Sequence, residues 1–241
     1  MDTNLNKESL KFKEYFHTIL NNRVENFIDE LNKNYKTYLF SGILRNYFLH
    51  IYEYPRDLDI IIHKNQNSNL ITSLLNKYGV YKINSFGGYK LYIDDLPIDI
   101  WFAEDTWAIK NNIIDTRKFK SIEEAVLHST FFNFSSILYD LNNNQFIYNS
   151  IFLNFLQNQE IDFVLVKNPS MILCIINIVY YAEKYRLNIS NNAKSYFIQN
   201  LVKFDEMEIY NVQYKHFGKI IYNINELYKF KSIIEQSLIT H

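Results

Sequence analysis

Cysteine, long hydrophobic runs, glycine and proline are all scarce in this sequence of 241 residues. Its one cysteine, Cys174, excludes an internal disulfide framework and any zinc site built from several cysteines. The longest apolar run, 171–182, is about a dozen residues long and includes Asn177, whereas a membrane-spanning helix needs about 20. Residues 1–16 lack the apolar stretch that a secretory signal requires. We therefore expect a soluble cytoplasmic protein with no membrane association.

An excess of charge of one sign is also missing, because 25 Lys and Arg residues stand against 26 Asp and Glu residues. The formal net charge of −1 argues against a strongly basic nucleic-acid coat. Five glycines and three prolines favour long regular elements over a turn-dense β-sandwich. Hydrophobic residues make up 48% of the chain, which is enough to bury a sizeable core.

Hydrophobic spacing predicts the secondary structure of the first 150 residues. Apolar residues at intervals of three and four predict one helix over 8–34, and shorter helices are expected over 43–52, 69–77 and 122–128. Strands are predicted over 37–42, 57–62, 81–85, 89–93 and 98–102. A hairpin is predicted from residues 131–141 and 145–148, which flank three asparagines.

The second part of the chain has a helical pattern from about residue 152 to the end. Pro169 is expected at the first position of a helix over 170–185. The predicted fold class is α+β: a head domain over 1–150, with a mixed sheet and flanking helices, followed by a small all-helical domain over 151–241. No Pro- or Ser-rich linker separates them, so we expect the two to pack together.

Three aspartates carry the chemical signal. Asp57 and Asp59 are two residues apart on a predicted strand and therefore share a face. Asp99 lies on a separate predicted strand and can bring a third carboxylate to the same point. Neighbouring carboxylates repel unless a cation lies between them or one is protonated. Such hard oxygen ligands suit Mg²⁺, and two such ions would activate an attacking hydroxyl and neutralise the charge that develops on a phosphate.

A small-residue turn, Ser41-Gly42, precedes these acids and lies between a predicted strand and a helix. Such a turn exposes backbone N–H groups to an anion. Arg45, one helical turn later, can reach the same phosphate through a charge-assisted fork, although it could instead pair with a carboxylate such as Glu53. Phosphate binding and metal binding are thus predicted side by side.

The stretch Ser41-Gly42-Ile43-Leu44-Arg45-Asn46, followed by Arg56-Asp57-Leu58-Asp59, resembles the nucleotidyltransferase (DNA polymerase beta-like) superfamily. It is most similar to the head of bacterial poly(A) polymerases and CCA-adding enzymes, where Gly-Gly-x-Val-Arg-Asp precedes Asp-x-Asp. The resemblance implies that Asp57, Asp59 and Asp99 are catalytic and hold two Mg²⁺ ions. Asp99 would ligate the catalytic ion and help to deprotonate the acceptor. Ser41, Gly42 and Arg45 would bind the nucleotide.

The sequence departs from this family where the tailing enzymes are basic. Ser129-Thr-Phe-Phe-Asn-Phe-Ser135 stands in place of an Arg-Arg-Asp-Phe-Thr-Ile-Asn stretch, and Met171, Cys174 and Asn177 stand where the neck carries arginines. Because these basic groups help to hold the incoming triphosphate, we do not expect the chain to add CCA to tRNA.

The resemblance implies an enzyme that moves a nucleoside monophosphate from an NTP, such as ATP, to a hydroxyl acceptor and releases pyrophosphate. The acceptor could be an RNA end, a protein or a small molecule. Two alternatives stay open: an antibiotic-type small-molecule nucleotidyltransferase, and a catalytically degenerate protein of this fold that binds a nucleotide or a partner protein. Trp101 and Trp107 are interpreted as core residues rather than base-stacking ones, and Cys174 as a small buried hydrophobe.

Overall fold

The computed structural model describes residues 2–64 and 70–239. It divides into two compact units. Unit 1 comprises Met1–Thr130 and Phe134–Leu153, and unit 2 comprises Phe131–Asn133 and Asn154–His241. Among the described residues, no helix combines the length and the apolar character needed to cross a lipid bilayer.

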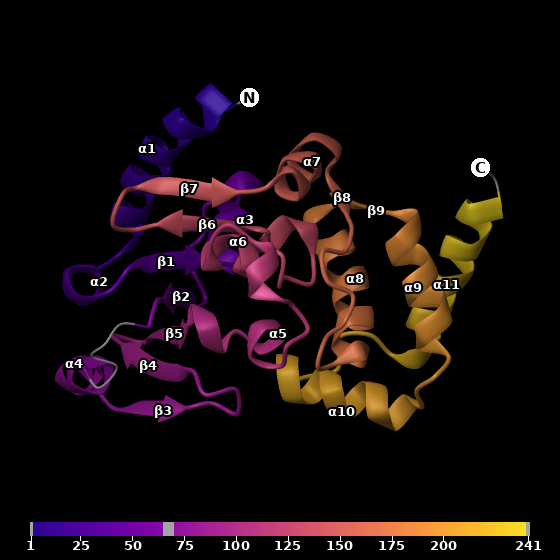
Figure 1. Cartoon of the computed structure of the whole chain (residues 1–241). Coiled ribbons are helices and arrows are strands. Elements are labelled where there is room, and N and C mark those ends of the chain that lie inside the picture. Colours follow the sequence, from indigo (N-terminus) through magenta and orange to yellow (C-terminus); the bar gives the residue numbers. More distant parts are fainter. Residues whose placement is uncertain (1, 65–69, 240–241) are drawn as a thin grey trace. The chain divides into compact units, whose positions relative to one another are not determined.

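Unit 1 is built on a seven-stranded mixed sheet in the order β3-β4-β5-β2-β1-β6-β7 (Figure 1). The central pair β2 and β5 is parallel, and the other neighbouring strands are antiparallel. The strands are β1 (Thr37–Phe40), β2 (Leu58–Ile62), β3 (Tyr81–Ile83), β4 (Tyr89–Ile93), β5 (Leu96–Phe102), β6 (Ile137–Asp140) and β7 (Gln145–Tyr148). The helices are α1 (Asp2–Ile19), α2 (Asn22–Asn34), α3 (Gly42–Phe48), α4 (Leu70–Tyr78), α5 (Trp107–Lys110), α6 (Ile122–Leu127) and α7 (Ser150–Asn158), which continues into unit 2, with short 3-10 turns at Ala103–Asp105, Thr116–Lys118 and Asn133–Ser135.

The two faces of this sheet are covered differently. On one face, Phe12 of α1 packs edge-on against Tyr139 of β6 and Tyr47 of α3. On the other face, α6 closes an apolar cluster with strand residues such as Ile61. Because Asp59 lies two residues before Ile61 on β2, it points to the face that α6 covers. The α+β class and the mixed sheet with flanking helices are confirmed.

The helix predicted over 8–34 is wrong in its continuity, because the structure has two helices, α1 and α2. Asn21 separates them, and its side chain accepts a hydrogen bond from the Val24 N–H to cap α2. The helix predicted over 43–52 ends at Phe48, since His50 has a φ of 58° that turns the chain out of the helix. Residue 69, the predicted start of α4, lies outside the described residues.

The hairpin predicted from 131–141 is shorter than expected. Only β6 pairs with β7, while the preceding residues form a 3-10 turn. Asn133 explains the difference, because its side chain donates to the Glu160 carbonyl and accepts from the Asp162 N–H. Phe132 also forms an isolated bridge with Phe163, so this aromatic stretch belongs to unit 2.

Unit 2 is mainly helical, with one addition that the sequence does not predict. A short parallel pair joins two strands that are far apart in the chain, and Ile161 pairs with Ile189. Pro169 does not occupy the first helical position: Ser170 caps the helix through a hydrogen bond from the Leu173 N–H, and Pro169 precedes the cap. The elements are β8 (Glu160–Ile161), α8 (Met171–Tyr185), β9 (Asn188–Ile189), α9 (Asn191–Leu201), α10 (Glu206–Phe217) and α11 (Ile224–Ile239).

Candidate active site

Two of the three predicted acids, Asp59 and Asp99, meet in one row that runs across the sheet of unit 1. In the pairing register, Lys90 of β4 lies opposite Asp99 of β5, Asp99 opposite Asp59 of β2, and Asp59 opposite Phe40 of β1. Residues paired across a sheet share a face, so the carboxylates of Asp59 and Asp99 lie on adjacent strands and on the same side. The parallel β2–β5 pair thus brings together two acids that are 40 positions apart in the chain.

Asp59 is the electrostatic centre of this row. Burial raises its pKa and the negative charges of Asp57 and Asp99 act in the same direction, so that the pKa is about 7 in place of the usual 3.8. Arg56 and a hydrogen bond from Ser41 oppose the shift. Asp57 itself lies just before β2, and Arg56 contacts its Oδ2 at 2.8 Å. The charges of Asp57 and Asp99 therefore both act on Asp59.

The Ser41-Gly42 turn lies beside these acids, because it directly follows Phe40, the register partner of Asp59. Ser41 has a φ of 61°, a left-handed value that costs a non-glycine residue energy, and such strain concentrates at functional sites. A Cβ built on Gly42 would lie 3.6 Å from Nη2 of Arg45, which is an ordinary contact. The packing around Gly42 therefore does not require glycine, whereas a ligand that approaches the backbone closely would.

Arg45 is buried, with 9% of its surface exposed. Its guanidinium lies 5.5 Å from the centre of the Phe134 ring and donates a long hydrogen bond of 3.4 Å to the Asn46 side chain. The structure therefore places Arg45 next to Gly42 and orients its charged group by stacking. All three predicted nucleotide-binding residues lie at one end of β1.

Two basic residues contact these acids, and their positions in the sequence predict no role for either of them. Nζ of Lys90 contacts Oδ2 of Asp99 at 3.1 Å, and both side chains are partly buried. Arg56, in contrast, is 81% exposed, so its contact with Asp57 is a weak surface ion pair. Two of the three acids are thus paired with a basic side chain.

The donor set fits a divalent cation only in part. Mg²⁺ is usually held by one or two carboxylates together with substrate phosphates, and Asp57 and Asp59 provide that number. The raised pKa of Asp59 indicates negative charge that a cation would relieve. Asp99 is engaged by Lys90, and among residues 2–64 and 70–239 no group of three or more His, Cys, Asp or Glu side chains is gathered as a ready metal centre.

Trp101 and Trp107, which the sequence interprets as core residues, are both partly buried. Nε1 of Trp101 donates to Oγ1 of Thr106 at 3.2 Å, and its ring packs against the cluster under α6. Cys174 is buried and free. On the same helix, Met171 is exposed and Asn177 is partly buried.

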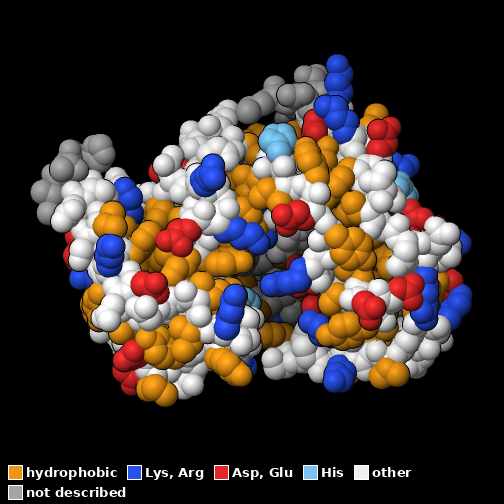
Figure 2. Space-filling view, turned by 180° about the vertical axis from the view of Figure 1, so that it is seen from behind, with side chains coloured by type: hydrophobic (Ala, Val, Ile, Leu, Met, Phe, Trp, Pro, Cys, Tyr) orange, Lys and Arg blue, Asp and Glu red, His pale blue; other side chains and the backbone are white. Residues whose placement is uncertain are grey.

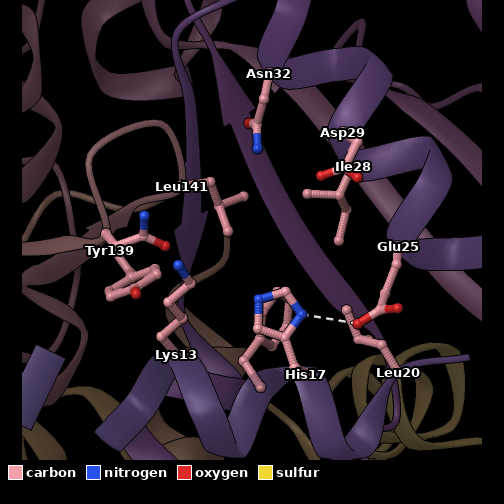
Figure 3. A pocket seen from close by; sticks show the side chains of 11 residues that line it. Lys13, His17, Leu20, Glu25, Ile28, Asp29, Asn32, Tyr139 and Leu141 are labelled. Carbon is pink, nitrogen blue, oxygen red and sulfur yellow. Dashed lines mark hydrogen bonds and ion pairs between the residues drawn. The ribbon is translucent and has the colours of Figure 1, made fainter. Parts of the chain in front are cut away.

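A separate cavity of about 300 Å³ lies in unit 1 between α1, α2 and the β6–β7 hairpin (Figure 3). Nδ1 of His17 faces Oε1 of Glu25 across it at 2.7 Å. Its walls contain none of the six predicted site residues; they include Lys13, Phe16, Ile28, Asp29, Asn32 and Tyr139. The cavity is therefore distinct from the row of acids.

The sequence matches no protein-family model, and no curated protein matches it. Solved structures do match. A CCA-adding enzyme in complex with CTP is 15% identical, over 92% of this chain and 54% of that chain, with a TM-score of 0.64. A Thermotoga maritima CCA-adding enzyme complexed with tRNA is 15% identical, over 92% and 53%, with a TM-score of 0.63. A tRNA-processing enzyme in an apo form is 14% identical, over 90% and 57%, with a TM-score of 0.62.

These similarities are at the level of fold. The resemblance to CCA-adding enzymes that the Ser41–Asn46 and Arg56–Asp59 motifs predict is confirmed for the architecture, across most of the chain. The chain spans about half the length of the solved structures that it matches.

Proposed function

We propose that the chain is a Mg²⁺-dependent nucleotidyltransferase that moves a nucleoside monophosphate from an NTP to a hydroxyl acceptor. One observation carries this proposal: the predicted phosphate-binding turn at Ser41-Gly42 directly follows Phe40, the register partner of Asp59. A triphosphate bound at the turn would therefore lie against the carboxylates. The fold similarity to CCA-adding enzymes supports the same reaction class.

In this proposal, the Ser41-Gly42 turn and Arg45 bind the triphosphate. Gly42 lets the phosphate approach the backbone, and the guanidinium of Arg45 lies within van der Waals distance of that position. The stacked Phe134 ring fixes the guanidinium, so less side-chain entropy is lost on binding. Asp57 and Asp59 would hold Mg²⁺, which neutralises negative charge on the phosphates when it is bound.

The reaction forms a bond from the acceptor oxygen to the α-phosphorus and breaks the bond between that phosphorus and the leaving pyrophosphate. Asp99 receives the acceptor proton, because it lies on the same face as Asp59 and beside it. The sheet holds Asp59 and Asp99 on rigid neighbouring strands, which keeps the two groups aligned.

The acceptor is expected to be an RNA end, a protein or a small molecule. The fold neighbours include a CCA-adding enzyme with tRNA, which favours an RNA end. The view in Figure 2 shows basic and acidic side chains interspersed with hydrophobic ones on that face, in keeping with the net charge of −1. Because phosphate contacts supply most non-specific affinity for RNA, we expect a short RNA end rather than a whole tRNA to be bound.

A second candidate is a nucleotide-binding protein of this fold without transfer activity. The Lys90–Asp99 ion pair favours it, since that contact engages the group proposed to accept the proton.

The test is transfer of label from α-³²P-labelled NTPs, with Mg²⁺, to tRNA lacking CCA, total RNA, protein and small-molecule hydroxyl acceptors. We expect label on at least one acceptor class and a loss of on the order of a thousandfold in Asp57→Asn, which removes a ligand charge. Nucleotide binding with no transfer to any class would favour the second candidate. Equal transfer by Asp57→Asn would refute the proposed site.

A further inference from the structure

Lys90 occupies a position in the acid row that backbone pairing fixes. Strand β4 runs antiparallel to β5 through the tight connection at Asp94 and Asp95, and this register sets Lys90 opposite Asp99. The lysine is therefore held beside the carboxylate by the sheet and not only by a flexible surface contact. Its Nζ lies 3.1 Å from Oδ2 of Asp99.

The ammonium group of Lys90 acts on more than one acid. The negative charges of both Asp99 and Asp57 raise the pKa of Lys90, while its partial burial lowers it. The group therefore lies in the combined field of the site.

A divalent ion on Asp99 would have to displace this ammonium group or lie within a few ångströms of it. A divalent ion and an ammonium group at such a distance repel each other, and the repulsion is stronger in a partly buried site than in water. Asp57 and Asp59 present a smaller obstacle, because the basic neighbour of Asp57, Arg56, is largely exposed and can move away. A divalent ion is therefore repelled more strongly at Asp99 than at Asp57 and Asp59.

We propose that the ammonium group of Lys90 takes the place of a second divalent ion at Asp99. The chain then binds a single divalent ion, through Asp57 and Asp59. This inference rests on the proposed function. It makes Lys90 a positioning residue, which orients Asp99 and compensates its charge.

The sheet offers a matched control for this role. Lys82 of β3 is the register partner of Lys90 and carries the same charge on the same face, one strand further from Asp99. It is exposed. Replacing it changes the net charge by the same amount without removing the contact to Asp99.

The experiment is a titration with Mn²⁺ alone, in which free ion is counted by electron paramagnetic resonance. We expect one bound Mn²⁺ per chain in the wild type and in Lys82→Met. In Lys90→Met and Lys90→Gln, whose folding is checked by circular dichroism, we expect a second ion bound at least tenfold more tightly than the wild type binds any second ion. Adding Asp99→Asn to Lys90→Met should remove that second ion.

Two different failures can be told apart. Two tightly bound ions in the wild type, or a single ion in both Lys90 variants, would overturn the role of Lys90 while leaving the proposed function intact. No bound ion in the wild type or in any variant would overturn the metal dependence of the proposed function, and the role of Lys90 with it.

Discussion

Replacing Asp59 with asparagine should stabilise the protein at alkaline pH. The native pKa of about 7 exceeds the usual value of 3.8, so the folded state disfavours the ionised carboxylate relative to the unfolded state. Between these two pKa values, the native state therefore binds more protons than the unfolded state. The stability of the wild type consequently falls as the pH rises through this window. Asparagine keeps an oxygen that can accept the hydrogen bond from Ser41 but carries no charge.

The magnitude follows from the shift. At about 1.4 kcal/mol per pKa unit, ionised Asp59 costs the wild type about 4 kcal/mol at pH 8 and less than about 1 kcal/mol at pH 4. The stability gain of Asp59→Asn should therefore be large at pH 8 and nearly absent at pH 4.

Urea denaturation with EDTA present, at pH 4, 6 and 8, measures this difference. Adding Mg²⁺ at pH 8 should reduce the difference in stability between Asp59→Asn and the wild type, because an ion that binds only the native wild type stabilises that protein alone. A variant less stable than the wild type at pH 8, or a gain that does not change with pH, would refute the electrostatic reasoning.

Substitutions at three further positions have defined outcomes. Gly42→Ala should leave the free energy of unfolding within about 0.5 kcal/mol of the wild type, because its Cβ meets only an ordinary contact, yet weaken NTP binding at least tenfold in calorimetry. Ser41→Gly should be more stable than Ser41→Ala by about 1–2 kcal/mol in urea titrations, because glycine tolerates a φ of 61°; equal stability would argue against strain at Ser41. Glu123→Gln should cost about 1–3 kcal/mol at pH 7, since Glu123 accepts from the Tyr38 hydroxyl at 2.6 Å. Hydrogen bonds from His63 and Tyr38 hold the pKa of Glu123 well below its usual value of 4.5, so its stabilisation shrinks progressively as the pH falls below that value; a cost of the same size at pH 5 and at pH 2 would contradict this sign.

The part of the site that the sequence predicts depends on local spacing. Asp57 and Asp59 are two residues apart, and this spacing alone predicts that they lie close together, although β2 begins at Leu58 and Asp57 lies just before it. Ser41-Gly42 follows an apolar strand, so a turn is expected there. These signals need only neighbouring residues, and each can be recognised without knowing the register of the sheet.

The Lys90–Asp99 contact depends on register, which local spacing does not provide. The predicted strand began at residue 98, whereas β5 begins at Leu96 and includes Pro97. With that strand extended, the turn at Asp94 and Asp95 would have set Lys90 opposite Asp99.

Two other differences between the predicted and the observed secondary structure arise because local hydrophobic spacing does not encode them. Hydrophobic spacing continues without interruption through residues 8–34, so the side-chain cap at Asn21 is the only local sign that α1 ends. The β8–β9 pair joins Ile161 to Ile189, and no sequence-local pattern predicts a two-residue pairing across that distance.

The most direct measurement of the central claim does not require the acceptor. Calorimetry with a non-hydrolysable NTP analogue, with Mg²⁺ or with EDTA, compares the wild type with Asp57→Asn. If Asp57 and Asp59 hold the ion that links the triphosphate to the Ser41-Gly42 turn, the wild type will bind the analogue at least tenfold more tightly with Mg²⁺, and Asp57→Asn will lose that gain. Binding of equal affinity with EDTA, or an undiminished effect of Mg²⁺ in Asp57→Asn, would contradict the claim.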